Sequence, residues 1–491
     1  MEDNDRVDSH RYAKADLERR LDRCTGRTLG QIDAAGVFQK AAGKTKVTGI
    51  AGDVIEQSVM GYPANSDQEP DLIVDGFEVE LKTTGLRRNK KGGGYEAKEP
   101  MSITAVSLKK IASEEFYRSN FWHKSKRMLI VYYLYDSEET VQAMGYADFP
   151  LVGYQFHCFD YEEREMLRSD WELVRDFVRQ IEQECPDEES RKTRYPLLSS
   201  ALRRELMLID TAPKYPHSPR FRLKRSTVTA IARKHFGDGL SALPEHYSSF
   251  AMIDRKLHEL AQMYYGGTLG EMASDMGVVF DSSKSNKNLA EQVVVRFFGG
   301  TGKMEDIELF AKIGLKAKSI TLTPTGARTE DMKLFTIDFG EFVDGAEFEE
   351  SLFAEYFSNN QLLCPVFEEP GHAAPLTDNI FKGFKRIAFD DAFLEGEVKP
   401  VWSKILHLVV NHELADVVCR DGEGRPIVNR TGVTRSAPNL PKAKDGLVFV
   451  RGTSADSTKK PECVNGVRMY KQQVWVKGSY IADRLKETSW I

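Results

Sequence analysis

Cysteine is scarce in this chain, and its few copies are not arranged for metal binding or cross-linking. The six cysteines among 491 residues are dispersed along the sequence, and no two of them form a Cys-x-x-Cys pair. Zinc knuckles need such pairs, and disulfide-stabilised secreted domains need a framework of closely spaced cysteines. We therefore expect neither a zinc site of this kind nor a disulfide framework.

Long hydrophobic runs and an excess of positive charge are also absent. The longest apolar run, Met128–Tyr135, is far shorter than the roughly 20 residues that span a bilayer. The N-terminus is polar and acidic, unlike the apolar part of a secretory signal. The formal net charge is -6, so a surface that binds nucleic acid must be local. We expect a cytoplasmic protein without a membrane partner, and a buried strand at Met128–Tyr135.

The chain is long enough for several packed domains and carries signs of an internal duplication. Hydrophobic residues make up 41% and charged residues 29%, which suits ordinary folded cores. Five short patterns recur in the same order in both halves. They start at Leu17 and Leu257, Thr28 and Thr268, Gly49 and Asn288, Leu81 and Leu315, and Arg220 and Gln473. Two unrelated α/β domains are the alternative. The Gly/Pro/Ser-rich stretch 236–250 is the expected boundary.

The clearest local pattern is a β-hairpin around Asp75-Gly76. An Asp-Gly pair between two apolar-rich segments favours a two-residue type I′ turn. That turn pairs Val74 with Phe77 and, further out, Asp71 with Glu80. One face of the hairpin is then apolar and the other polar. The apolar face carries Leu72, Val74, Phe77, Val79 and Leu81, and the polar face carries Asp71, Glu78, Glu80 and Lys82 with Ile73.

The polar face of this hairpin places two acids opposite each other. Cβ atoms of directly opposed residues lie about 4.5–5.5 Å apart, so the carboxylates of Asp71 and Glu80 repel unless a cation lies between them. Mg²⁺ commonly binds one or two carboxylates together with water and phosphate oxygens. Lys82 lies on the same face, two residues beyond Glu80. Two acids and a lysine on one hairpin are what metal-dependent phosphodiester hydrolysis needs.

Other readings of these residues stay open at this point. A Glu-x-Lys tripeptide is common in charged strands, and alternate polar residues can simply face solvent. The basic loop that follows is suited to phosphate contact, or is a solvated hairpin tip. Its basic residues are Arg87, Arg88, Lys90 and Lys91. Glu56 lies near the edge of the apolar stripe of the preceding helix, from where its carboxylate could reach the same metal or face solvent.

A resemblance to a known family favours the catalytic reading. The succession "TGIAGDVIE", "EPD", "VELK", "FWHKSKRMLIVYY", "SDWELV" and "RLKRSTVTAIARKHF" resembles the MutH family of PD-(D/E)xK nucleases, which act at GATC in DNA. The length and duplication resemble its two-domain, GATC-cutting type II restriction enzymes, the Sau-three-A-I type. The resemblance covers most of the first half and, more faintly, the second. It implies two tandem MutH-like α/β domains, at 1–240 and 248–491, each a mixed sheet flanked by helices.

The resemblance also assigns roles to residues. Glu56, Asp71, Glu80 and Lys82 match the catalytic positions, with the three acids as metal ligands, although the gap from Asp71 to Glu80 is two residues longer here than in the compact family form. Lys124 matches a lysine near the site, and Lys224–Thr227 match a DNA-contacting stretch. The second half has Val295 at the place of Glu56 and, by our alignment of Leu315-Lys316 with Leu81-Lys82, Gly314 at the place of Glu80.

The sequence therefore predicts a Mg²⁺-dependent endonuclease for double-stranded DNA containing GATC. The first domain cuts, and the second binds DNA without cutting. Arg or Lys can hydrogen-bond guanine in the major groove; the candidates are Arg194, Arg222, Lys224, Arg225, Arg451 and Lys477. One active site per chain implies a homodimer or clustering on DNA. The alternatives are a mismatch-repair nickase and a non-catalytic protein that binds GATC or methylated GATC.

Overall fold

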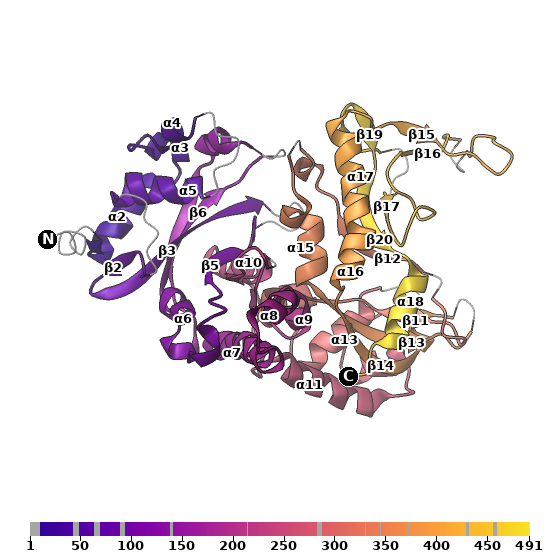
Figure 1. Ribbon diagram of the computed structural model, residues 1–491. Coiled ribbons are helices and arrows are strands. Elements are labelled where there is room, and N and C mark those ends of the chain that lie inside the picture. The colour runs from indigo at the N-terminus through magenta and orange to yellow at the C-terminus, as the bar shows by residue number, and fades with distance from the viewer. Residues whose placement is uncertain are drawn as a thin grey trace. The chain divides into compact units, whose positions relative to one another are not determined.

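The chain is a mixed α/β protein, and its computed structural model divides it into two compact units (Figure 1). The described residues are 10–42, 49–62, 69–88, 94–137, 141–213, 215–281, 287–328, 330–343, 345–371, 374–428, 432–454 and 459–491. Unit 1 holds residues 1–136, 141–256 and 294–316, and unit 2 holds 137–140, 257–293 and 317–491. The expected domain limits, 1–240 and 248–491, stay a prediction. The two units divide the chain differently, since unit 1 also contains residues 294–316.

Unit 1 is built on a mixed six-stranded sheet that continues from strand to strand in the order β1-β2-β3-β6-β7, with β4 paired to β3. The pairs β1–β2 and β3–β6 are parallel, and the others are antiparallel. A second sheet has the order β5-β9-β8. The strands are β1 (Arg11–Tyr12), β2 (Leu72–Val74), β3 (Phe77–Arg88), β4 (Tyr95–Ala97), β5 (Met101–Ala105), β6 (Met128–Leu134), β7 (Leu151–His157), β8 (Ile209–Asp210) and β9 (Arg220–Leu223).

Helices pack around these sheets, and α2, α4 and α5 lie on the same side of the large sheet as the N-terminus of the chain (Figure 1). The α-helices of unit 1 are α2 (Lys14–Cys24), α3 (Leu29–Ile32), α4 (Val37–Ala41), α5 (Ile50–Val54), α6 (Asn120–Ser125), α7 (Tyr161–Glu184), α8 (Glu188–Arg194), α9 (Leu197–Ala201), α10 (Arg225–His235) and α14 (Glu308–Ile313). Helix α5 continues into a π-helix at Ile55–Met60 (η1). Helices α11 (Phe250–Tyr264) and α13 (Leu289–Phe297) and strand β10 (Leu315–Ala317) span the unit boundaries.

The buried strand expected at Met128–Tyr135 is present as β6. All seven of its residues are buried, because it lies between β3 and β7 and is covered on both faces. The predicted hairpin also has its predicted register, with Leu72 opposite Val79. Phe77 is an exception to the expected apolar face, since it is 56% exposed at the hairpin end, where the Arg127 guanidinium lies over its ring.

A segment that follows the predicted boundary folds with unit 1. Lys312 of α14 is 4% exposed, and its Nζ lies 2.5 Å from a Glu163 carboxylate oxygen and 2.6 Å from one of Glu308. The hydroxyls of Ser226 and Thr227, at the start of α10, donate to the Lys312 carbonyl. Buried charges are tolerated when they are paired in this way, so residues 294–316 form part of the packing of the first unit.

Unit 2 repeats the two-sheet plan. Strands β10, β11 (Ile320–Leu322), β13 (Gln361–Glu368) and β14 (Ile380–Ile387) form one four-stranded sheet, with β11 parallel and β14 antiparallel to β13. Strands β12 (Met332–Thr336), β20 (Lys471–Val476) and β17 (Val448–Thr453) form another. Two small hairpins are β15–β16 (Asp416–Val418, Ser436–Pro438) and β18–β19 (Glu462–Val464, Val467–Met469). The helices are α12 (Leu269–Asp275), α15 (Leu352–Asn359), α16 (Asp391–Phe393), α17 (Lys399–Val410) and α18 (Gly478–Glu487), with a π-helix at Leu394–Val398.

Several local features recur in both units, as a duplication predicts. Thr28 and Thr268 each begin a helix with a capping box. The outer three-stranded sheets have equivalent orders, β5-β9-β8 and β12-β20-β17, and the central strand of each leads into a helix through a lysine. The amide of Gly61 donates to the Glu56 carbonyl, as that of Gly300 does to the Val295 carbonyl, both at 2.9 Å. This supports the placement of Val295 opposite Glu56.

The predicted alignment of Leu315-Lys316 with Leu81-Lys82 is wrong by two residues. In unit 1, Thr84 pairs with Tyr132, the last β6 residue before the register shift against β7. In unit 2, Ile320 pairs with Val366, the last β13 residue before the equivalent shift against β14. Ile320 therefore corresponds to Thr84, and Lys318 corresponds to Lys82. The sequence match was misleading because the Leu315-Lys316 pair lies two residues before the position that corresponds to Leu81-Lys82.

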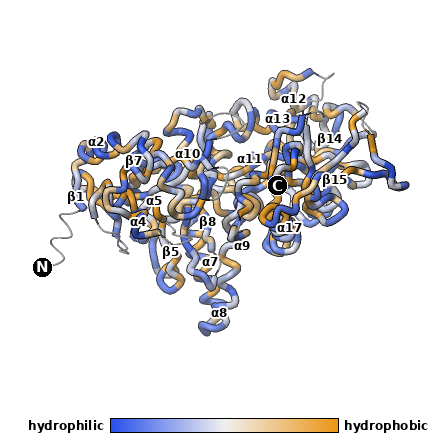
Figure 2. Tube along the Cα trace, turned by 90° about the horizontal axis from the view of Figure 1, so that it is seen from above, coloured by the Kyte–Doolittle hydropathy of each residue, from blue (hydrophilic) through white to orange (hydrophobic). Residues whose placement is uncertain are grey.

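Hydropathy along the chain agrees with a protein built from packed, amphipathic elements. Hydrophobic and hydrophilic residues alternate along the helices, as the colouring of α7 and α10 illustrates (Figure 2). Within the described ranges, no helix combines the length and apolarity needed to cross a membrane. All six cysteines are free thiols, in line with the expected lack of a disulfide framework.

Candidate active site

The hairpin positions Asp71 and Glu80 at its open end. Asp75 and Gly76 have φ values of 49° and 84°, as a type I′ turn requires at both central residues. The pairing runs outward to Leu72 and Val79, so Asp71 and Glu80 follow as the next opposed positions. Asp71 is fixed there because its Oδ2 accepts the Leu81 amide at 2.9 Å. The predicted juxtaposition of the two acids is therefore present.

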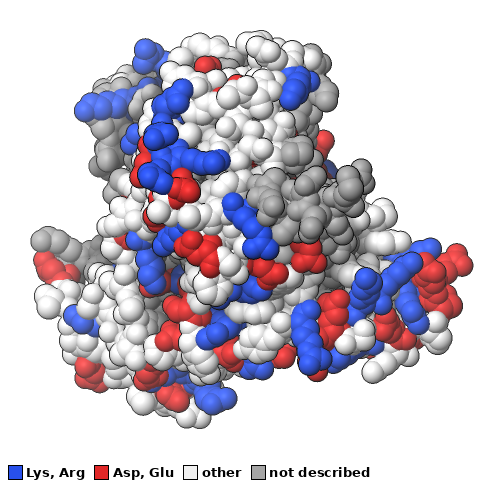
Figure 3. Space-filling model, turned by 90° about the vertical axis from the view of Figure 1, so that its left-hand side faces the viewer, with Lys and Arg blue, Asp and Glu red and all other residues white. Residues whose placement is uncertain are grey.

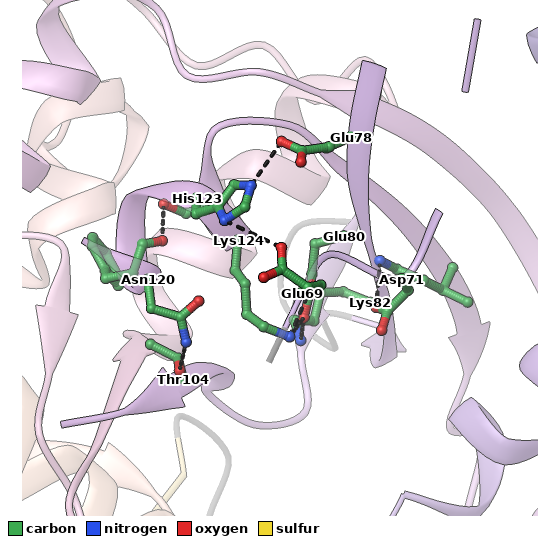
Figure 4. A network of polar contacts seen from close by, with 12 residues as sticks. Glu69, Asp71, Glu78, Glu80, Lys82, Thr104, Asn120, His123 and Lys124 are labelled. Atoms are coloured by element: carbon green, nitrogen blue, oxygen red, sulfur yellow. Dashed lines mark hydrogen bonds and ion pairs between the residues drawn. The ribbon is translucent and has the colours of Figure 1, made fainter. Parts of the chain in front are cut away.

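Two lysines converge on the Glu80 carboxylate, as Figure 4 shows. Lys82 Nζ lies 2.7 Å from Oε1, and Lys124 Nζ lies 3.2 Å from both carboxylate oxygens. Glu80 is 2% exposed and Lys124 is 8% exposed, so these charges interact with little screening by water. Lys124 reaches the hairpin from α6, which begins at the N-cap residue Ser119. The structure thus brings together Glu80, Lys82 and Lys124.

Glu56 extends from the π-helix η1 toward the same acids. Burial raises its pKa from 4.5 to about 7, and the nearby charges of Asp71, Asp53 and Glu80 contribute to this increase while Lys82 opposes it. The pKa of Asp71 is also raised, first by burial and then by Glu80. Glu56 is therefore close enough to Asp71 and Glu80 for their charges to affect its pKa. π-Helical turns inside helices occur frequently at functional sites.

The chemistry of this donor set suits a hard divalent cation. Burial and like-charge repulsion raise the pKa values of Glu56 and Asp71, so both effects penalise the ionised forms of these two carboxyl groups. A cation with oxygen ligands removes both penalties, and Mg²⁺ accepts such a set with water completing its shell. Asp71, Glu80 and Glu56 are the residues that fit this role, with Lys82 and Lys124 beside them.

Tyr62 is a site neighbour that the sequence analysis missed. Its ring is 2% exposed and stacks on His10, with centroids 4.2 Å apart, and His10 Nδ1 lies 2.7 Å from the Asp71 carbonyl oxygen. Its hydroxyl is buried without a hydrogen-bond partner among the described residues. Burial raises its pKa, and the charges of Asp71 and Glu56 add to this effect. A tyrosine two residues after a helix carries no sequence signal of such a role.

A second polar group lies beside the acid cluster on the same hairpin. Ligand atoms of Glu69, Glu78 and His123 lie within 4.8 Å of one another (Figure 4). Lys126 Nζ and His123 Nε2 each lie 2.7 Å from Glu78 Oε2. The hydrogen bond from Lys126 is the largest cause that lowers the pKa of Glu78. The Lys126 ammonium group therefore already neutralises this carboxylate, which distinguishes Glu78 from Asp71 and Glu56, whose pKa values are raised.

The residues of unit 1 that are predicted to contact DNA differ in their surroundings. Arg87 lies over the Tyr135 ring and Arg88 over the Tyr95 ring, whereas Lys90 and Lys91 lie outside the described residues. Arg194 is exposed on α8 and pairs with Glu184 at 3.0 Å. Figure 3 shows basic and acidic side chains interspersed over much of the face seen there, so phosphate contacts must come from local groups of cations.

Three of the predicted DNA-reading side chains are instead used inside the protein. Lys224 is 3% exposed, and its Nζ donates to the Leu206 carbonyl at 2.6 Å. This corrects the prediction of a DNA contact, because the buried ammonium group bonds to the segment that leads into β8. Arg222 makes two hydrogen bonds to Asp210, at 2.7 and 3.1 Å, and Arg225 donates to the Ala97 carbonyl.

The two candidates in unit 2 occupy more accessible places. Arg451 pairs with Asp331 at 2.8 Å, and its side chain is 45% exposed. Lys477 is the N-cap residue of α18, and its backbone amide donates to the Leu447 carbonyl at 2.9 Å. Both residues therefore keep partly exposed side chains at the end of the β12-β20-β17 sheet.

Comparisons with known proteins agree with this geometry. Residues 60–170 match the family described as "DNA mismatch repair enzyme MutH". This segment includes Asp71, Glu80, Lys82 and Lys124, while Glu56 precedes it. The chain is also 21% identical over 502 aligned positions to "Type II restriction enzyme Sau3AI" of Staphylococcus aureus, covering 91% of this chain and 97% of that protein. The segment that carries Asp71, Glu80, Lys82 and Lys124 is thus similar to the MutH family, and the chain is similar to a type II restriction enzyme along most of its length.

Proposed function

We propose that this chain is a type II restriction endonuclease that hydrolyses both strands of double-stranded DNA at GATC, with Mg²⁺ as its cofactor. The convergence of Glu56, Asp71, Glu80, Lys82 and Lys124 inside the MutH-matched segment and its flank carries this proposal. The similarity to a type II restriction enzyme over 91% of the chain favours double-strand cleavage over nicking.

Each residue of the cluster has a role in the proposed hydrolysis. Asp71, Glu80 and Glu56 would hold the metal, which when bound polarises the scissile phosphate and acidifies water. Lys82, whose Nζ donates to Glu80, would help to position the attacking water, and its charge would favour the developing negative charge on phosphorus-bound oxygens. Lys124 donates to both oxygens of the Glu80 carboxylate and would hold it in place. The products would carry a 5′-phosphate.

The second half of the chain lacks acids at the described positions aligned with Glu56 and Glu80, so one chain would cut one strand at a time. Val295 stands at the place of Glu56, and Lys318 at that of Lys82. We propose that unit 2 binds DNA without cutting, and that two chains meet on one site, as a homodimer or by clustering. Light scattering on cognate duplex tests this, since a strict monomer that still makes double-strand breaks contradicts it.

Cleavage of defined duplexes tests the proposed function. Purified chain is incubated with Mg²⁺ and a duplex containing GATC, unmethylated or methylated, and with a duplex in which the site is scrambled. We expect cleavage of both strands at GATC alone, lost when the metal is chelated. Cleavage of one strand would favour the alternative of a mismatch-repair nickase; the matched family is described as a DNA mismatch repair enzyme. Binding to GATC without cleavage under any of these conditions would leave only a binding protein.

A further inference from the structure

Lys318 occupies in unit 2 the place that the catalytic lysine candidate occupies in unit 1. The β11–β13 register places Ile320 opposite Val366, and the β3–β6 register places Thr84 opposite Tyr132. Lys318 and Lys82 lie two residues before these paired positions. The residue that precedes Lys318 by two is Lys316, whereas the one that precedes Lys82 by two is Glu80. The second half of the chain therefore has a basic residue, Lys316, where the first half has the buried acid Glu80.

The Lys318 side chain leads to the edge of the outer sheet of unit 2. Its Nζ donates to the backbone carbonyl of Lys333, on edge strand β12, at 2.9 Å. Lys333 is exposed and pairs with Trp475 of the central strand β20. Trp475 pairs in turn with Phe449 of β17. These three residues form one row across the sheet, so the Lys333 side chain lies on the same face as the two aromatic rings.

Arg451 adds a guanidinium group that aromatic stacking holds in position. Its Cζ lies 4.8 Å from the centroid of the Trp475 ring and 5.0 Å from that of Phe449. One guanidinium nitrogen pairs with Asp331 at 2.8 Å, while the side chain stays 45% exposed. A planar guanidinium that is stacked and half-exposed presents its remaining N–H groups to an anion with little further loss of entropy.

The equivalent row of residues in unit 1 has no net charge, because it contains one positive and one negative side chain. Arg222 corresponds to Trp475, because each lies two residues before the lysine that precedes the following helix. Arg222 pairs through two hydrogen bonds with Asp210 on β8 and lies opposite Ser102 on β5. The matching rows of the two units therefore differ, with Ser102, Arg222 and Asp210 in unit 1 and Lys333, Trp475 and Phe449 in unit 2.

We propose that Lys318, Lys333 and Arg451 form a metal-independent binding site for the phosphates of the DNA backbone in unit 2. This inference deepens the proposed function and rests on it. In unit 1 a metal ion would mediate between carboxylates and a phosphate, whereas in unit 2 the ammonium and guanidinium groups contact the phosphates directly. The site then holds DNA irrespective of sequence and without metal, while unit 1 requires metal to act.

Fluorescence anisotropy in EDTA tests this site, because the metal-free chain binds DNA without cutting it. The full chain is titrated with a labelled duplex containing GATC and with a scrambled duplex, at several salt concentrations. In the double variant Lys318→Ala/Lys333→Ala we expect the affinity for both duplexes to fall by about tenfold, and the slope of log affinity against log salt to decrease by about 2, roughly one per lost phosphate contact. Lys318→Arg/Lys333→Arg should restore the slope.

A matched control removes two exposed lysines elsewhere in unit 2, in the variant Lys404→Ala/Lys486→Ala. We expect this control to change the slope by less than half as much. The single variant Lys333→Ala removes only an exposed side chain and guards against misfolding of the double variant. If the wild-type chain cleaves GATC duplex but its metal-free affinity and slope are the same in the double variant, the inference is wrong and the proposed function stands. If the wild-type chain cleaves neither duplex with Mg²⁺, the proposed function fails, whatever the slope.

Discussion

Replacing Glu56 by glutamine should make the metal-free protein more stable at alkaline pH while it abolishes cleavage. The pKa of Glu56 is raised from 4.5 to about 7 by burial and by neighbouring acids. A difference of one in pKa between the folded and unfolded states corresponds to about 1.4 kcal/mol, so the folded state loses at most about 3 kcal/mol when this carboxyl ionises. Allowing for its partial exposure to water, we expect a net cost of about 2 kcal/mol.

The sign of the pH dependence follows from linkage. Because the folded state holds this proton more tightly than the unfolded state, stability decreases as pH rises from about 4.5 to about 7, and stays at the lower level above that. Glu56→Gln removes this decrease. Denaturant unfolding in EDTA should therefore give equal stabilities at pH 4.5, and a difference of about 2 kcal/mol in favour of the variant at pH 8.

Magnesium should reverse the order of stability, so that the wild type becomes more stable than Glu56→Gln. A ligand that binds only the folded state stabilises it in proportion to the logarithm of its concentration over its dissociation constant, and the variant lacks one of the proposed ligands. Equal pH profiles for the wild type and Glu56→Gln in EDTA would refute the reasoning, because Glu56 would then lie outside the acid cluster. The variant Glu18→Gln, which changes an exposed acid of α2, is the control.

Three further predictions address the lysine, the buried tyrosine and the packing of unit 1. Lys82→Ala should lower the single-turnover cleavage rate by roughly 10²–10⁴-fold while DNA affinity in EDTA stays within about twofold; a rate within tenfold of wild type would exclude Lys82 from the chemistry. Tyr62→Phe should leave the fold intact and weaken Mn²⁺ binding measured by calorimetry, because a buried hydroxyl without a hydrogen-bond partner among the described residues points to a water or ion among the acids; unchanged binding would contradict this. Lys312→Ala should destabilise unit 1 by about 3 kcal/mol, since it leaves Glu163 buried and without this ion pair; urea unfolding monitored by tryptophan fluorescence measures this, and a loss below about 1 kcal/mol would contradict it.

The sequence predicts the hairpin of the candidate site well because local chemistry determines it. An Asp-Gly turn with two left-handed residues allows one register, and that register places Asp71 opposite Glu80 without any knowledge of the remaining fold. The buried strand β6 is equally predictable, because an uninterrupted apolar run requires cover on both faces.

The remainder depends on contacts between distant residues. The ion pair of Lys124 with Glu80 joins residues 44 positions apart, and only the parallel pairing of β3 with β6 brings α6 to the hairpin. Lys224 belongs to a basic run that suggests DNA contact, yet its ammonium group bonds to the carbonyl of Leu206, 18 residues earlier in the chain. The association of residues 294–316 with unit 1 also depends on a pair, Lys312 with Glu163, that no local pattern reveals.

The central claim is that the acid–lysine cluster cuts DNA at GATC, and sequencing the ends of a digested plasmid tests it most directly. Unmethylated and methylated plasmids are incubated with Mg²⁺ and either the wild-type chain or Lys82→Ala. The account predicts linear fragments whose ends all lie at GATC, with 5′-phosphates, for the wild type on at least one plasmid, and intact plasmid for the variant. Ends at other sequences, or equal cleavage by the variant, would contradict it.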